Sequence, residues 1–245
     1  MKPSDTVSPR NRLLALVTVA LTGSLVLTGC DSLDELPDPA RSEAAPAPGG
    51  SALQAVEGLT VKGRAPKTGY DRSEFGSAWA DTDHNGCGTR DDILADQLDD
   101  VSRDSDGCTV LSGVLDPDPY TGTRIQFQRG RSKVDIDHLV ALSDAWQKGA
   151  QKWSDGKRRA FANDPLNLVA ADSSTNRRKG DGDTATWLPP NKDYRCAYVA
   201  GQVSVKKKYG LWVTQAEQDA MTDVLRTCPQ EKLLAGGNPT DAPAR

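Results

Sequence analysis

Only one of the two histidines in the chain lies in a setting that suits acid–base chemistry. His138 follows Asp137 at the end of the apolar, β-branched run 134–140, whereas His84 lies in a polar turn. A histidine with an ordinary pKa of about 6.5 can accept a proton at neutral pH. His138 is therefore the candidate general base.

Two asparagines, Asn167 and Asn176, follow the Asp-His pair and lie nine positions apart. We expect Asn167 to orient the imidazole of His138, and Asn176 to approach the same cation as Asp137. Two oxygen ligands, completed by water and phosphate oxygens, favour Mg²⁺ or Mn²⁺ over zinc. Such a metal would clamp a phosphate and its leaving oxygen, so the predicted reaction is hydrolysis of a phosphodiester.

Cationic side chains follow Asn176 directly. Lys179, three positions later, shares nearly the same helix face and is the first predicted phosphate ligand. Arg177 is the second, although Arg177 and Arg178 are less well placed by spacing alone. Each residue also has an ordinary interpretation, such as a packed strand histidine, a turn cap or a solvated lysine. Their joint occurrence in one basic segment favours the catalytic site.

Two strands and a helix are expected to position these residues. The apolar pattern predicts strands at 134–138 and 166–171, and Asp172-Ser173-Ser174 predicts the cap of a helix that carries Asn176. Adjacent strand residues project to opposite sides, so Asp137 and His138 share one site only if the strand bends or bulges there. The other predicted elements are a helix from 89 that ends before 104, strands at 109–115 and 123–128, and helices at 142–150, 154–163, 193–209 and 214–227.

Charge is distributed unevenly along the chain, whose net charge is −4. Residues 30–128 contain 8 basic and 19 acidic side chains, whereas residues 129–210 contain 16 basic and 9 acidic ones. The basic part carries all the candidate site residues. A local positive field suits a polyanionic substrate, although a solvated lysine-rich surface has the same composition.

The N-terminal residues predict export. A positive start and the apolar run 13–27 end in Leu27-Thr28-Gly29-Cys30, which resembles the bacterial lipobox. Cleavage before Cys30 and acylation of its thiol would hold the protein on the outer face of a membrane. An ordinary secretory signal with a chance cysteine is the alternative. We assign residues 1–29 to the signal peptide, 30–51 to a flexible tether, 52–235 to one globular domain and 236–245 to a loose tail.

The other four cysteines are Cys87, Cys108, Cys196 and Cys228. In an exported protein they predict two disulfides. Of the three pairings, Cys87–Cys108 and Cys196–Cys228 are favoured because each brackets a compact local segment. A four-cysteine zinc site is disfavoured, since no two cysteines are separated by two residues.

The segment 81–86 reads Asp-Thr-Asp-His-Asn-Gly and matches the first half of a calcium-binding loop, with Asp92 at the position of the twelfth residue. The usual residue there is glutamate, and no clear helix precedes the segment. An Asx-rich turn that leads into Cys87 is therefore favoured over a calcium site.

A family resemblance rests on these same residues. Asp137-His138-Leu139-Val140, Asn167 and the segment 176–180 (Asn-Arg-Arg-Lys-Gly) together resemble the HNH, or His-Me finger, endonuclease motif. More closely, residues 135–190 resemble secreted bacterial members of the family of the C-terminal domain of GmrSD-type restriction nucleases. The quoted matches include Ala-Phe-Ala-Asn-Asp at 160–164 and Trp-x-Pro-Pro at 187–190, and the likeness extends from about 79 to 228.

This resemblance implies a disulfide-stabilised α+β fold: a ββα-metal core at about 134–180, with added helices and a short antiparallel sheet. It implies His138 as general base, Asn167 as the residue that orients it, and Asp137 and Asn176 as metal ligands. Asn176 stands where the family's name has its final histidine, which weakens any preference for Zn²⁺ or Ni²⁺.

The predicted function is that of a lipid-anchored, metal-dependent endonuclease that acts outside the cytoplasmic membrane on DNA or, as the less favoured substrate, RNA. No obligate protein partner is expected. One alternative is a non-catalytic surface lipoprotein with a decayed nuclease fold that binds an envelope polymer or a partner. Another is a hydrolase of a different phosphodiester polymer. The presence of all four site residues argues against decay.

Overall fold

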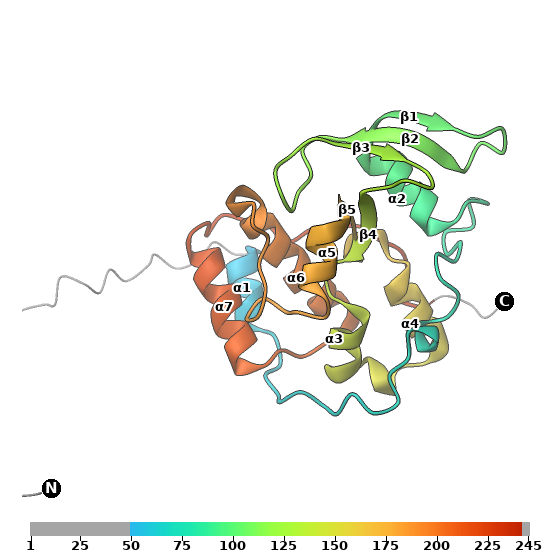
Figure 1. The fold of residues 1–245 in the computed structure, drawn as a ribbon. Helices are drawn as coiled ribbons and strands as arrows, with labels where there is room; N and C mark the ends of the chain where they lie inside the picture. The colour runs from blue at the N-terminus through green and yellow to red at the C-terminus, as the bar shows by residue number, and fades with distance from the viewer. Residues whose placement is uncertain (1–49, 242–245) are drawn as a thin grey trace, which may run out of the picture. The chain divides into compact units, whose positions relative to one another are not determined.

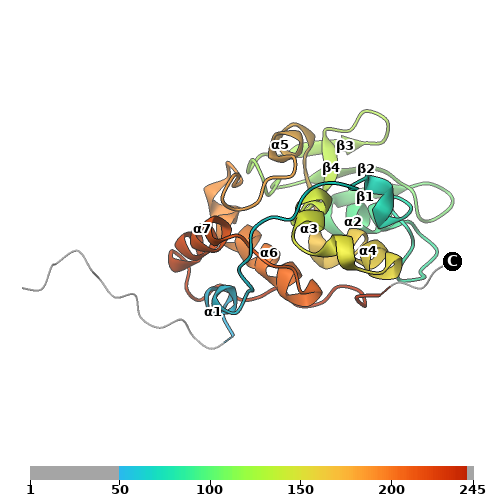
Figure 2. The ribbon, with the colours of Figure 1, turned by 90° about the horizontal axis from the view of Figure 1, so that it is seen from below.

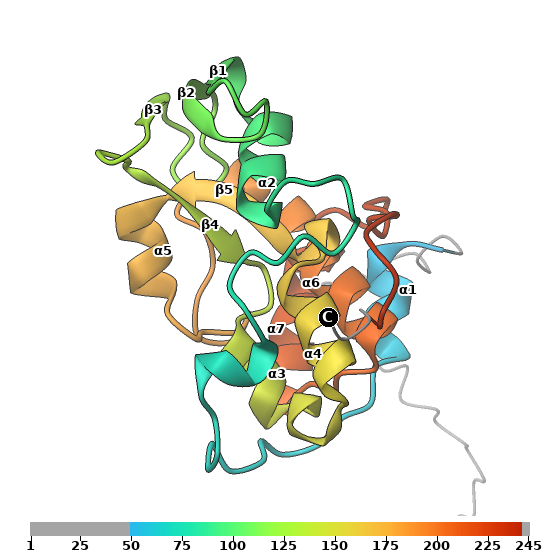
Figure 3. The ribbon, with the colours of Figure 1, turned by 90° about the vertical axis from the view of Figure 1, so that its right-hand side faces the viewer.

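The structure is a computed structural model that describes residues 50–241, shown as a ribbon in Figures 1 to 3. The predicted signal peptide, Cys30, most of the predicted tether and residues 242–245 lie outside the described residues. Helices and short antiparallel sheets alternate along the described chain, which contains two disulfides. A mixed helix and sheet fold is therefore confirmed.

The α-helices are α1 (Ala52–Glu57), α2 (Thr89–Gln97), α3 (Leu142–Gln147), α4 (Asp155–Ala162), α5 (Ser173–Lys179), α6 (Arg195–Tyr209) and α7 (Gln215–Arg226). Short 3₁₀ helices are η1 (Arg72–Phe75), η2 (Ala150–Lys152), η3 (Pro165–Asn167) and η4 (Lys192–Tyr194). The strands are β1 (Asp99–Arg103), β2 (Val110–Leu115), β3 (Ile125–Gln128), β4 (Val134–His138) and β5 (Leu168–Asp172).

Strands β4 and β5 form a two-stranded antiparallel sheet. The pairing runs without a register shift from Val134 opposite Asp172 to His138 opposite Leu168. Helix α5 follows β5 directly and packs against both strands, while α2 also contacts both. Figure 3 shows α5 and α2 on either side of this sheet. The bulge considered for the strand at Asp137 is absent.

Helix α5 begins where capping chemistry predicts it. The Asp172 carboxylate accepts a hydrogen bond from the backbone N–H of Thr175 at 2.7 Å, which satisfies one donor of the first turn. Gly180 ends the helix with a φ of 57°, a left-handed value that glycine adopts readily. The turn between β5 and α5 is thus fixed locally.

Strands β1, β2 and β3 form a separate antiparallel sheet in that order, at the top of Figure 1. The helix from Thr89 ends before Asp104, as predicted, but it stops at Gln97, and Asp99–Arg103 forms a strand, β1, that the sequence did not predict. Most β1 side chains are exposed, so no apolar alternation indicates a strand there. Pairing with β2, rather than side-chain burial, forms β1.

Three apolar clusters fill the interior. The first lies among α1, α6 and α7, the second joins α3 and α4 to the end of α6, and the third lies between α2, the three-stranded sheet and the β4–β5 pair. Figure 2 shows α6 between α1 and α7 on one side and α3 and α4 on the other. Helix α6 thus supplies side chains to two of the three clusters. No helix within residues 50–241 has both the length and the apolar character needed to cross a membrane.

Both predicted disulfides are present. Cys87–Cys108 joins the loop before α2 to the turn between β1 and β2, with Cα atoms 5.3 Å apart. Cys196–Cys228 joins the start of α6 to the second residue after α7, with Cα atoms 6.4 Å apart. Each bond therefore links elements close in sequence, as the favoured pairing requires.

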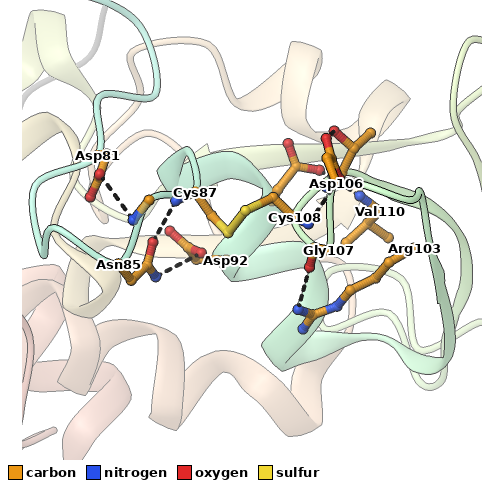
Figure 4. The surroundings of a disulfide bond; sticks show 12 residues. Asp81, Asn85, Cys87, Asp92, Arg103, Asp106, Gly107, Cys108 and Val110 are labelled. Atoms are coloured by element: carbon orange, nitrogen blue, oxygen red, sulfur yellow. Dashed lines mark hydrogen bonds between the residues drawn. A yellow bond between two sulfur atoms is a disulfide. The ribbon is translucent and has the colours of Figure 1, made fainter.

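Figure 4 shows the first disulfide beside the turn that resembles a calcium loop. The Asn85 carboxamide donates to Asp83 at 3.2 Å and to Asp92 at 3.1 Å, and the N–H of Gly86 donates to Asp81 at 3.2 Å. Within residues 50–241, no group of three or more His, Cys, Asp or Glu side chains is arranged to hold a metal ion. The N–H groups of Asn85 and Cys87 donate to the side chains of Asp83 and Asn85, which is the hydrogen bonding of Asx turns.

The tail that was expected to be loose from residue 236 makes contacts at its start. The N–H of Asn238 donates to the buried Asp164 carboxylate at 3.1 Å, and Lys208 donates to the Asn238 carbonyl at 2.7 Å. Residues up to 238 are therefore held against α6.

A charge cluster lies where the helices meet, and its members are Arg64, Asp144, Lys148, Asp183, Lys206 and Glu217. The Lys148 Nζ atom lies 2.6–2.8 Å from an oxygen of each of the three acids. Lys206 contacts Asp144 and Glu217 at 3.1 and 2.9 Å. Arg64 closes the cluster from its one partly exposed edge. Three cations thus balance three carboxylates.

This buried charge cluster joins the segment before η1, α3, the loop after α5, α6 and α7. Burial alone would raise the pKa of Asp144, but Lys206 and Lys148 outweigh it and hold that pKa below its ordinary value. The pKa of Asp183 is lowered in the same way, because Lys148 and Arg64 outweigh the effect of burial. Carboxyls with lowered pKa values stabilise the fold above about pH 4, and this contribution is lost as the pH falls further.

Lys148→Met is expected to lower the free energy of unfolding at pH 7 by about 3–5 kcal/mol, because it leaves buried carboxylates without their shared cation. The pKa of an uncompensated buried carboxyl rises above its unfolded value, so the loss should shrink as the pH is lowered from 8 towards 5. Urea unfolding at both pH values measures this. Lys152→Met, at an exposed lysine on the same stretch of chain, is the matched control. Equal, small losses for both variants would contradict a structural role of the cluster.

Candidate active site

A cleft of about 390 Å³ opens at the end of β4. Its walls come from the end of β4, the start of α3, the end of α5 and the segment before η1. The lining residues are Lys67, Tyr70, Arg72, Ile136, Asp137, His138, Ala141, Leu142, Ser143, Asn176, Gly180 and Asp181. Asp137, His138 and Asn176 therefore share one cleft, although Asp137 and His138 project from opposite sides of the strand.

His138 is buried, with 6% of its surface exposed, at the inner end of this cleft. Its Nε2 atom lies 2.8 Å from the carbonyl oxygen of Ala162 in α4. A carbonyl can only accept a hydrogen bond, so the neutral ring must carry its proton on Nε2. The lone pair is then on Nδ1, which leaves this nitrogen free to accept a proton.

Burial also determines the charge of the imidazole. Loss of solvation lowers the pKa of His138 to about 4, against the opposing effects of the Ala162 carbonyl and the Asp137 carboxylate. The ring is therefore neutral at pH 7. The indole of Trp79 is nearly parallel to it, at an interplanar angle of 13° with ring centroids 6.1 Å apart.

The Asp137 carboxylate is held from the opposite side of β4. The buried Tyr120 hydroxyl donates to its Oδ2 atom at 2.5 Å, and the ammonium group of Lys179 lies 2.9 Å from the same oxygen. Burial, followed by the nearby Asp137 charge, raises the pKa of Tyr120 well above its ordinary value, so the hydroxyl remains a donor. Tyr120 lies in a loop in which the sequence indicated only a turn.

Lys179 occupies a position that differs from the predicted one. Its side chain is fully buried, and its ammonium group donates to the His138 carbonyl at 2.7 Å as well as to Asp137 at 3.2 Å. Lys179 lies on the same face of α5 as Asn176, as expected, but its ammonium group points into the protein. In this arrangement Lys179 neutralises Asp137 and fixes the end of β4, and it is not among the residues that line the cleft.

Asn167 also acts on the backbone. It is fully buried at the end of η3, its Oδ1 atom accepts from the Val140 N–H at 2.8 Å, and its Nδ2 atom donates to the Val140 carbonyl at 3.3 Å. The Leu139 N–H donates to the Asn167 carbonyl at 2.8 Å. Asn167 thus pins the chain just after His138, and its contacts are with this backbone rather than with the imidazole.

Asn176 lies on α5, half-buried, and lines the cleft. Its carboxamide makes one long hydrogen bond of 3.4 Å to Asp135, which leaves its other polar atom open to the cleft. The Arg177 guanidinium lies 4.0 Å from Asp135, and its side chain is 70% exposed. Arg177 does not line the cleft, although its charge is free to attract an anion at the rim.

Two cations that the sequence did not single out line the cleft. Lys67 and Arg72 are exposed and come from the acidic part of the chain. Lys67 precedes η1, and Arg72 is its first residue. Lys67 pairs with Asp181 at 3.1 Å, a partner that is itself half exposed. The one sequence signal is a run in which Lys67, Tyr70 and Arg72 stand close together. This run by itself does not indicate a binding site, because only the fold brings it beside His138.

Oxygen donors at the site fit a hard divalent cation. Asp137 and Asn176 both line the cleft, and Mg²⁺ typically takes one or two protein carboxylates together with water and phosphate oxygens. The Asp137 carboxylate accepts from Tyr120 and Lys179, yet its two oxygens offer about four lone-pair sites. A single metal contact to Asp137 is therefore compatible with its present partners.

Comparison with known proteins identifies the family of this chain. The family model "GmrSD restriction endonucleases, C-terminal domain" matches residues 88–224, more than half of the chain. This range contains Asp137, His138, Asn167 and Asn176, but not Lys67 or Arg72.

A relative from Arthroderma benhamiae, described as an "Uncharacterized secreted protein", is 38% identical over 180 residues. The match covers 73% of this chain and 85% of the relative. The resemblance inferred from the sequence motifs is thus confirmed, and the chain belongs to the family defined by the C-terminal domain of GmrSD restriction endonucleases.

Proposed function

We propose that this protein is a metal-dependent endonuclease that hydrolyses phosphodiester bonds in nucleic acid, with DNA as the favoured substrate. One observation carries the proposal: a neutral histidine of fixed tautomer lines a cleft that also contains two exposed cations, Lys67 and Arg72. The family of the chain supports the same reaction class. We also infer that β4, β5 and α5 form the ββα-metal core of this family.

In this proposal each residue of the site has a defined role. His138 accepts a proton from the attacking water at Nδ1, while Ala162 holds the proton on Nε2. Arg72 binds the scissile phosphate, and Asn167 positions His138 through the backbone. Asp137 and Asn176 would hold Mg²⁺ or Mn²⁺, which would supply charge stabilisation at the phosphate and leaving oxygen.

The site of action is proposed to be outside the cytoplasmic membrane. The secreted description of the relative and the two disulfides support export. The lipobox-like sequence supports attachment through Cys30, which lies outside the described residues.

A second candidate is the non-catalytic surface protein that binds an envelope polymer. The observation in its favour is the Lys179–Asp137 ion pair, which already neutralises a proposed metal ligand. This candidate requires that no phosphodiester, whether in DNA, RNA or an envelope polymer, be cleaved in the presence of Mg²⁺ or Mn²⁺.

His138→Asn is expected to slow plasmid nicking with Mg²⁺ by roughly 100- to 10,000-fold, the usual contribution of a general base. His84→Asn is the matched control, because His84 is exposed and its φ of 63° suits asparagine. EDTA should abolish nicking by both the wild type and the control. Nicking that persists in EDTA or in His138→Asn would refute the mechanism.

Arg72→Gln is expected to lower kcat/KM on DNA at least about tenfold and to reduce the slope of log affinity against log salt by about one, as loss of one phosphate contact does. Arg124→Gln, which removes a cation paired with Asp116 on the surface, should change neither quantity.

Lys179→Met tests the prediction from the sequence that Lys179 is a phosphate ligand. We expect this variant to have a lower free energy of unfolding, because Asp137 loses its ammonium partner. A reduced salt slope with unchanged stability would restore Lys179 as a phosphate ligand.

Cys30→Ser is expected to move the protein from the detergent phase to the aqueous phase in Triton X-114 partitioning of expressing bacteria, since acylation requires the thiol. Cys196→Ser removes a different cysteine and should not change the partitioning. Detergent partitioning that is insensitive to Cys30→Ser would exclude lipidation at this residue.

A further inference from the structure

A second cavity, of about 230 Å³, is lined by η1 and the residues that follow it, by His138 and Leu142, and by the end of α4. It shares Arg72, His138 and Leu142 with the cleft, so the two spaces adjoin at the proposed scissile phosphate. We call it the Trp79 cavity. Its other walls include Phe75, Ala78 and the indole of Trp79.

The lining suits a small, flat, aromatic ligand. It is mainly apolar, and apart from His138 the only ionisable side chain among the lining residues is that of Arg72. Pockets for drug-sized ligands enclose roughly 300–1,000 Å³, so this cavity accommodates a single ring system rather than a larger molecule. A hydrated ion would find few polar partners there.

The indole that forms one wall is held firmly. Trp79 is nearly parallel to the His138 ring, and the guanidinium of Arg90 lies 5.7 Å from its centroid. Its backbone has a φ of 57°, a conformation that bulky residues seldom adopt. The indole is only partly buried, which leaves apolar aromatic surface next to the reacting group.

We propose that the Trp79 cavity binds one unpaired nucleobase of the nucleotide next to the scissile phosphate. This inference rests on the proposed nuclease function and specifies its substrate: single-stranded nucleic acid, or strands with locally unpaired bases. A base attached to the bound phosphate reaches the cavity because Arg72 and His138 border both spaces. In a duplex the same base is stacked and paired, and its extrusion opposes binding.

Photo-crosslinking tests the cavity directly and does not depend on hydrolysis. Wild-type protein in EDTA is irradiated with short oligonucleotides that contain 5-iodouracil at successive positions, and the attached peptides are identified by mass spectrometry. We expect a crosslink to Trp79 or Phe75 with the single strand and its loss when the complementary strand is annealed. A crosslink confined to other residues, or of equal yield in the duplex, would overturn the inference.

A filled cavity gives the second test. Ala78→Phe adds a ring to the cavity wall without altering His138 or Arg72, whereas Ser105→Phe adds one to the exposed β1–β2 turn as a matched control. Loss of base stacking typically lowers affinity by roughly 5- to 150-fold. An abasic residue beside the cleaved bond should therefore reduce single-turnover kcat/KM, relative to the intact substrate, by about tenfold or more in the wild type and in Ser105→Phe. In Ala78→Phe, whose cavity is already filled, the abasic and intact substrates should be cleaved at nearly the same rate.

The two proposals fail in different ways. If His138→Asn retains full activity, the nuclease mechanism fails, while crosslinking to Trp79 still decides whether the cavity binds a base. If His138→Asn is inactive but abasic and intact substrates are cleaved equally, the nuclease function stands and the base-binding cavity is excluded. Faster cleavage of duplex than of single strand would likewise exclude it.

Discussion

Neutralisation of charge in the interior is the constraint on which the rest of this structure depends. Lys148 is fully buried among Asp144, Asp183 and Glu217, and Lys206 is fully buried against Asp144 and Glu217. Burial alone would lower the pKa of Lys206, but these two carboxylates raise it above its ordinary value. An isolated charge would be too costly to bury, so the helices that carry these groups must meet in one arrangement. The loop after α5 joins this cluster through Asp183, which anchors the chain just beyond the cleft.

Much of the candidate active site is built by polar side chains that bind backbone. Asn167 bonds both polar groups of the Val140 backbone, Lys179 bonds the His138 carbonyl, and the Ala162 carbonyl bonds the imidazole. Each of these contacts satisfies a buried polar group, which would otherwise destabilise the fold. Stability and positioning of the base are therefore served by the same hydrogen bonds. The consequence is a site in which His138 has little freedom to rotate.

The structure also suggests how an acidic protein can attract a polyanion. The segment that contains Lys67 and Arg72 belongs to the acidic part of the chain, yet it lines the same cleft as helix α5, whose last turn is basic. Local fields depend on which side chains adjoin a site rather than on net charge. Arg72 borders both the cleft and the Trp79 cavity, so one cation can serve both spaces. In the binding mode that we propose, this arrangement orients a bound strand with its phosphate at Arg72 and its base towards Trp79.

Local patterns in the sequence determined the strand that ends in Asp137-His138 and the helix capped by Asp172, because apolar alternation and capping are encoded within a few residues. The spacing of the cysteines favoured one of three disulfide pairings, and the structure contains that pairing. Motifs spread along the chain indicated the family. Strand β1 was not predicted from the sequence, because its exposed side chains carry no such pattern. Only the tertiary structure decided that Lys179 turns inward to Asp137, that Asn167 holds backbone, and that Arg72 and Trp79 adjoin His138. These placements depend on contacts between residues tens of positions apart, and on where a buried charge finds its partner, which no local pattern specifies.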